Sequence, residues 1–88
     1  MAETNEYQKL LTELIQKQMV IFGPNIALDK AKKVPGLTID NNGSVLSISG
    51  EPQMVLKNVA AEYESLSPQI AKMTLGSLLE KYSTVKSS

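Results

Sequence analysis

The sequence predicts an α+β fold that is mostly α. Two helix–proline–helix pairs form a pseudo-two-fold four-helix arrangement and are joined by a central two-stranded β-hairpin. Three observations predict it. Apolar residues recur at helical spacing in both halves of the chain, and each periodic segment is interrupted by a proline, Pro24 or Pro68. Between the halves, Asn42-Gly43 separates two apolar segments that alternate like strands, which is a strong hairpin signal.

The first helical pair is expected over residues 7–34. A start signal of the capping-box kind, Asn5 followed by Gln8, precedes it. Gly23-Pro24 should end the first helix and begin a shorter one over about residues 24–33, because proline suits a first helical position. The residues expected to face the core are Tyr7, Leu10, Leu11, Leu14, Ile15, Gln18, Ile21 and Phe22 in the first helix, and Ile26, Ala27, Leu28 and Ala31 in the second.

The hairpin is expected over residues 37–48. A two-residue loop at Asn42-Gly43 would pair Leu37 with Ile48, and Ile39 with Leu46, so that the apolar side chains share one face. Pairing Ile39 with Val45 would break this agreement, so we prefer the two-residue loop. An isolated two-stranded ribbon is marginally stable, and its apolar face should therefore pack on the helices.

The second helical pair is expected over residues 51–82. Ser49 or Glu51 should cap its first helix, with Pro52 in the first turn, and Ser67 should cap its second helix. Its expected core residues are Val55, Leu56, Val59, Ala60, Tyr63, Leu66, Ala71, Leu75, Leu78, Leu79 and Tyr82. The chain is thus predicted to be a single domain over residues 1–88, with flexible tails at about 1–4 and 83–88.

The two halves resemble each other when residues 10–34 are laid over residues 54–78. Pro24, Ile26 and Ala27 then coincide with Pro68, Ile70 and Ala71. Either an internal duplication or the common requirements of helix pairs can produce this match. Both interpretations predict two similar helix corners.

Composition excludes several classes of function. The chain has 88 residues, nine basic and nine acidic, and its basic residues are all lysines. Without net positive charge or arginine, we expect no nucleic-acid partner. Without cysteine and histidine, we expect no thiolate or histidine catalysis, metal centre or other cofactor. No secretory signal and no apolar run long enough for a membrane span is visible, so a cytoplasmic protein is expected.

The loop at residues 40–44 has a second interpretation as a calcium-binding loop. Asp40, Asn42 and Ser44 have ligand spacing, and Glu51 is twelfth from Asp40. However, Val45 occupies the sixth position, where such loops need glycine. The hairpin turn is therefore preferred.

Lysines gather at the end of the second predicted helix. Lys30, Lys32 and Lys33 there complement the negative end of the helix dipole. Phosphate or nucleic-acid binding is the weaker alternative. Nowhere does the sequence organise an acid, a base and a nucleophile, so no catalytic residue is expected and the protein is predicted not to be an enzyme.

Four apolar residues fall off the predicted buried faces. Met19, Val20, Met54 and Met73 lie at the edge of their helices' apolar stripes or away from them. Methionine is common in adaptable contact surfaces, so these residues are predicted to bind a partner. In the alternative interpretation, the hairpin or a neighbouring helix covers them.

These observations favour a small non-enzymatic protein-interaction or regulatory module that acts through an apolar helical surface. Its partner would be another protein or a second copy in a homodimer. The alternative is a carrier or sensor of a small apolar ligand, with a pocket between the helical pairs.

Overall fold

The computed structural model describes residues 4–82. Its elements are α1 (Thr4–Phe22), α2 (Pro24–Lys32), β1 (Leu37–Ile39), β2 (Val45–Ile48), α3 (Pro52–Glu64) and α4 (Pro68–Lys81). The predicted fold class, two helix pairs with a hairpin between them, is confirmed. Helix α1 begins at Thr4, so Asn5 lies inside it and the predicted cap is wrong. Of the tails predicted at about residues 1–4 and 83–88, residues 1–3 and 83–88 lie outside the described residues, and Thr4 is the first residue of α1.

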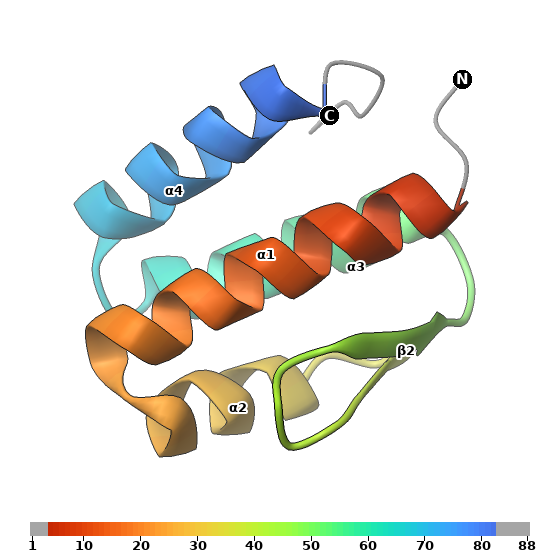
Figure 1. Cartoon of the computed structure of the whole chain (residues 1–88), viewed down its shortest axis with the longest axis horizontal. Coiled ribbons are helices and arrows are strands. Elements are labelled where there is room, and N and C mark those ends of the chain that lie inside the picture. The colour runs from red at the N-terminus through yellow and green to blue at the C-terminus, as the bar shows by residue number, and fades with distance from the viewer. Residues whose placement is uncertain (1–3, 83–88) are drawn as a thin grey trace.

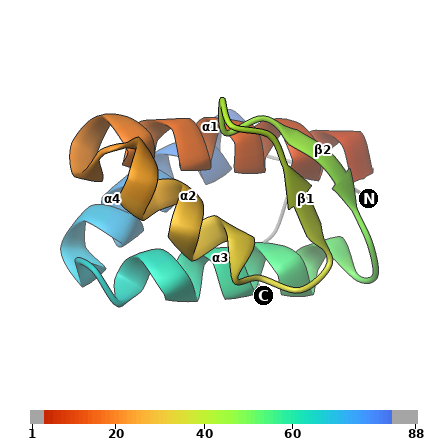
Figure 2. The ribbon, with the colours of Figure 1, turned by 90° about the horizontal axis from the view of Figure 1, so that it is seen from below.

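The two proline corners lie at the same end of the molecule. Helices α1 and α3 pack together and run in the same direction, while α2 and α4 run back from the two corners (Figures 1 and 2). One corner is Gly23-Pro24, between α1 and α2. The other is Ser67-Pro68, where the Ser67 side chain accepts a hydrogen bond from the backbone N–H of Ile70 as predicted.

The core lies between α1, α2 and α3, with α4 packed beside α1 and α3. Most of the predicted core residues are buried, including six of α1 and five of α3. In α4, Ala71 and Leu78 are buried, while Leu75, Leu79 and Tyr82 pack against the core with part of their surface exposed. The predicted inward faces are therefore confirmed for most positions.

Two predicted core residues are wrong. Ile21 and Ile26 were expected to face inward, yet they are 47% and 49% exposed. Ile21 lies in the last turn of α1, where the chain turns into α2, and Ile26 lies about 100° or more around α2 from each of its buried residues. Helix α2 packs through Ala27, Leu28 and Ala31 instead.

The hairpin contains a bulge that the sequence did not predict. Leu37 pairs with Ile48 as expected, but Ile39 faces Val45 instead of Leu46. The cause lies in the turn, because Asp40 Oδ1 accepts hydrogen bonds of 2.9 Å from the backbone N–H groups of Asn42 and Ser44. This closes a longer loop than two residues and moves Val45, not Leu46, onto the core side.

Polar side chains of α1 hold the bulged strand. Thr12 Oγ1 accepts a hydrogen bond of 3.0 Å from the backbone N–H of Val45. Gln8 and Gln16, one turn before and one turn after Thr12, donate to the carbonyl groups of Leu46 and Asn42. Residues four apart share one helix face, so this face of α1 binds the backbone of the hairpin.

Candidate interaction surface

The two corners bring together two segments without charge. Residues 18–28 and 65–71 contain no Asp, Glu, Lys or Arg, although 20% of the whole chain is charged. The first segment runs from the last turn of α1 into α2, and the second runs from the end of α3 into α4. Since both corners lie at one end of the molecule (Figures 1 and 2), the two uncharged segments lie at the same end.

Large apolar side chains are exposed at this end. Val20 is 87% exposed, and Ile21 and Ile26 are about half exposed. Met73, on α4, is 67% exposed. A hydrogen bond of 2.8 Å from Gln18 Nε2 to Thr74 Oγ1 joins α1 and α4 near the corners, and Val20, two residues after the buried Gln18, lies on nearly the opposite side of α1. We call these four residues, Val20, Ile21, Ile26 and Met73, the corner surface.

The structure separates the four residues that the sequence singled out. Val20 and Met73 lie on the corner surface. Met54 is also exposed, but it lies in the first turn of α3, at the opposite end of the molecule from Val20. Met19 is partly buried and packs against the core. The hairpin turn covers it. The backbone of Gly43 lies so close to Met19 that a Cβ atom added to this glycine would be only 2.6 Å from Met19 Sδ.

A buried hydrogen bond joins α2 and α3 near the two corners. Tyr63, in α3, is fully buried and donates a hydrogen bond of 2.9 Å from its hydroxyl to the carbonyl oxygen of Ala27 in α2. Burial raises the pKa of Tyr63, so its hydroxyl stays protonated and remains a donor. This bond ties the start of α2 to the end of α3, and so fixes one corner relative to the other.

Charged residues stand at the borders of the two uncharged segments. Lys17 and Asp29 flank the first segment, and Glu64 and Lys72 flank the second. Two are basic and two are acidic, so the border as a whole is neutral. An apolar centre within a polar border is the usual composition of a protein–protein interface.

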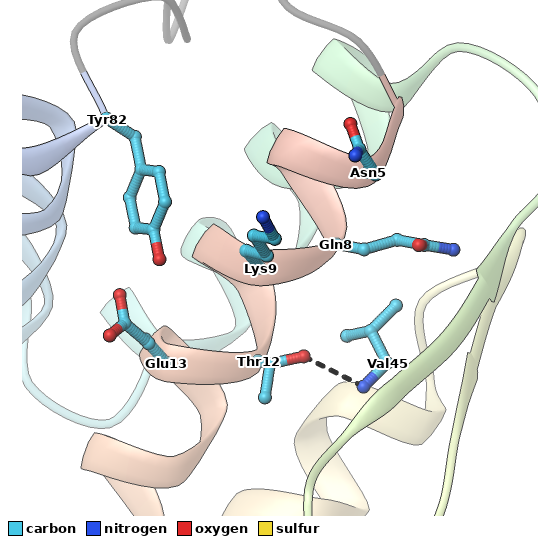
Figure 3. Close-up of a pocket in the computed structure, with 7 residues that line it drawn as sticks. All are labelled: Asn5, Gln8, Lys9, Thr12, Glu13, Val45 and Tyr82. Atoms are coloured by element: carbon cyan, nitrogen blue, oxygen red, sulfur yellow. Dashed lines mark hydrogen bonds between the residues drawn. The ribbon is translucent and has the colours of Figure 1, made fainter.

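A cavity of about 350 Å³ lies elsewhere, between α1, β2 and the end of α4 (Figure 3). Polar groups and the apolar parts of longer side chains both line it, and the lining residues are Asn5, Gln8, Lys9, Thr12, Glu13, Val45 and Tyr82. Glu13 Oε1 accepts a hydrogen bond of 2.6 Å from Lys81 Nζ, and the Tyr82 hydroxyl points toward the same carboxylate. Because α1 and α4 belong to different helical pairs, this cavity lies where the carrier hypothesis expected a pocket.

Two ionisable groups that line this cavity, Glu13 and Tyr82, have pKa values shifted away from neutrality. The hydrogen bond from Lys81 lowers the pKa of Glu13. Burial, followed by the hydrogen bond with Glu13, raises the pKa of Tyr82. Both shifts move the groups further from neutrality, whereas a general acid or base works best with a pKa near the working pH.

A second cavity, of about 330 Å³, lies between α3 and α4. It is lined by Leu56, Ala60 and Leu75, with Lys57 and Glu64 beside them. It lies inside the second helical pair, whereas the carrier hypothesis expected a pocket between the two pairs.

The sequence missed Ile21 and Ile26 as members of the surface. The spacing of Ile21 matched the buried face of α1, whereas Ile26 lies about 100° or more around α2 from Ala27, Leu28 and Ala31, so helical spacing could have placed it outside the core. The absence of charge from residue 18 to residue 28 was visible in the sequence and is the signal that could have found them.

Comparisons with known proteins give no family. The chain matches no family model, and no curated protein or solved structure shows significant similarity to it. Within residues 4–82, no group of three or more acidic side chains could hold a metal ion. No helix in this part of the chain is both long and apolar enough to cross a membrane.

Proposed function

We propose that this chain is a small non-enzymatic protein-interaction module and that the corner surface is where a protein partner binds. The observation that carries the proposal is the exposure of four large apolar side chains, three of which (Val20, Ile21 and Ile26) lie in a segment without charge. A partner that covers these side chains removes apolar area from water, at roughly 25 cal/mol per Å². Within the two uncharged segments, binding of the partner removes no charged group from water, because these segments contain none.

The partner should present an apolar and uncharged face of its own. A charged side chain pressed against Val20 or Ile26 would lose its hydration without gaining an ion pair. The mixed charges at the border can pair with a partner's charges and orient the contact. A cytoplasmic location and the absence of a nucleic-acid partner stay predictions that rest on composition.

The proposal is tested by photo-cross-linking in the native cell. A photo-reactive amino acid placed at Val20 is expected to give discrete adducts with protein, whereas the same amino acid at Met54 is expected to give none. Adding Ile26→Asp to the Val20 probe should lower the adduct yield about tenfold or more, because a buried unpaired charge costs at least 1.4 kcal/mol.

Met54→Asp provides a matched control. Ile26 and Met54 each follow a helix-starting proline by two residues, and each is about half exposed. An aspartate in the first turn is favourable in both helices, so both variants should fold. The Val20 adducts should persist with Met54→Asp. Loss of the adducts in both variants, or no adduct at Val20, would refute the corner surface as a binding site.

A further inference from the structure

We infer that α4 is a lid, which opens and closes while α1, α2, α3 and the hairpin stay folded together. Two of its 14 residues, Ala71 and Leu78, are buried, whereas five of the 13 residues of α3 are buried. Packing of an apolar face supplies most of the stability of a helix in a folded protein. Helix α4 is therefore held less firmly than α3.

A glycine inside α4 weakens this helix without serving its packing. Gly76 is the ninth residue of α4. Apart from its chain neighbours and the backbone of its own helix, nothing lies within 4 Å of a Cβ atom built on it. Glycine loses more backbone freedom on folding than alanine does, so it destabilises the interior of a helix. An alanine would fit at this position and would make α4 more stable.

The contact between α4 and α1 contains a buried polar group that is only partly satisfied. Gln18 is 0% exposed, and its Nε2 donates to Thr74 Oγ1 of α4. Its Oε1 has no hydrogen-bond partner within residues 4–82. This oxygen loses its hydration when α4 closes and regains it when α4 opens, which favours opening. The ion pair between Glu13 and Lys81 also joins the two helices, but exposed ion pairs of this kind stabilise little.

Both cavities described above border α4. One is lined by Leu75 of α4 together with Leu56 and Ala60 of α3, and the other by Tyr82 at the end of α4. Side chains that line a cavity lack packing partners on that side, so opening breaks fewer contacts there.

The position of α4 lets it open alone. It packs on α1 and α3 and lies on the side of α1 away from the hairpin (Figure 1). Residues 65–67 connect it to α3 and would form the hinge. No other described element has to move when α4 leaves. Opening uncovers apolar side chains of the core, including Leu56.

Hydrogen exchange of the ¹⁵N-labelled full chain, followed by nuclear magnetic resonance, tests the lid. A detached helix of 14 residues is marginally stable in water, so its amides exchange once it leaves. Protection factors in α4 should be at least about tenfold lower than the highest ones in α1 and α3. Gly76→Ala should raise those of α4 about fivefold, which corresponds to about 1 kcal/mol of helix propensity.

Tyr63→Phe distinguishes opening of the lid from unfolding of the whole chain. It removes the hydrogen bond between α3 and α2, which stays intact when α4 opens. The highest protection factors of α1 and α3 should therefore fall about fivefold, while those of α4 stay unchanged.

Three results would overturn the lid. The first is an equal fall in α4, α1 and α3 with Tyr63→Phe, and the second is wild-type protection in α4 as high as in α1 and α3. The third is unchanged protection in α4 with Gly76→Ala. The purified chain is measured without a partner, so none of these results bears on binding at the corner surface.

Discussion

Tyr63→Ala is expected to lower the free energy of unfolding by about 3–5 kcal/mol. Tyr63 is 0% exposed and is the largest fully buried side chain among the described residues. An 88-residue domain with ordinary stability has about 4–13 kcal/mol in total, so this change removes a large share of it. Urea unfolding followed by circular dichroism measures the loss.

Tyr63→Phe is the matched control. It keeps the ring in the core and removes only the hydroxyl, which donates to the carbonyl oxygen of Ala27. We expect a loss of about 1 kcal/mol, the usual net value of one buried hydrogen bond. If Tyr63→Ala cost no more than Tyr63→Phe, the ring would not be packed between α2 and α3 as the structure shows.

Gly36→Ala is expected to lower the free energy of unfolding by about 2–4 kcal/mol. Gly36 has a φ of +84°, in the left-handed region that disfavours a side chain. A Cβ atom there would also collide with the backbone carbonyl oxygen of Ser49. The same two residues share a backbone hydrogen bond of 2.7 Å, from the N–H of Ser49 to the carbonyl of Gly36, which closes the base of the hairpin.

Gly50→Ala is the control that separates the steric collision of an added Cβ atom from the cost of a left-handed backbone conformation. Gly50 has a similar φ of +89°, but nothing lies within 4 Å of a Cβ atom built on it. Its replacement should cost only the left-handed conformation, about 1–2 kcal/mol. Thermal unfolding of the two variants gives the comparison. Equal losses would mean that the backbone of Ser49 does not approach Gly36 closely.

The helices could be predicted because the signals that set them are local. Pro24, Pro52 and Pro68 each begin a helix in the structure, as their position in the sequence predicted. The side chain of Ser67 caps α4 as expected. Apolar spacing then identified most of the buried faces, because the spacing of a helix determines which residues share one side of it.

The hairpin register could not be predicted, because distant residues help to set it. The Asn42-Gly43 signal correctly located the turn. However, the bulge depends on the carboxylate of Asp40 and on the hydrogen bond between Val45 and Thr12, which is 33 residues away in the sequence. The hydrogen bonds of the turn and of the α1 side chains together set which residues of β1 and β2 pair. The alternation of apolar residues along the strands does not show these contacts.

The candidate site was predicted in part. The sequence identified Val20 and Met73 because they lie off their helices' apolar faces. It grouped them with Met19 and Met54, although the hairpin covers Met19 and Met54 lies at the far end of the molecule. Which exposed residues share a surface depends on how the helices pack, and no single helix shows it.

The most direct test of the corner surface is a comparison of photo-cross-linking positions in the native cell. A photo-reactive amino acid at Val20, Ile26 or Met73 should give adducts with the same protein. At Leu46 in the hairpin or at Met54 in the first turn of α3, which are also exposed, it should give none. Adducts centred on Leu46 or Met54, with none at the corner residues, would contradict the corner surface as the contact site.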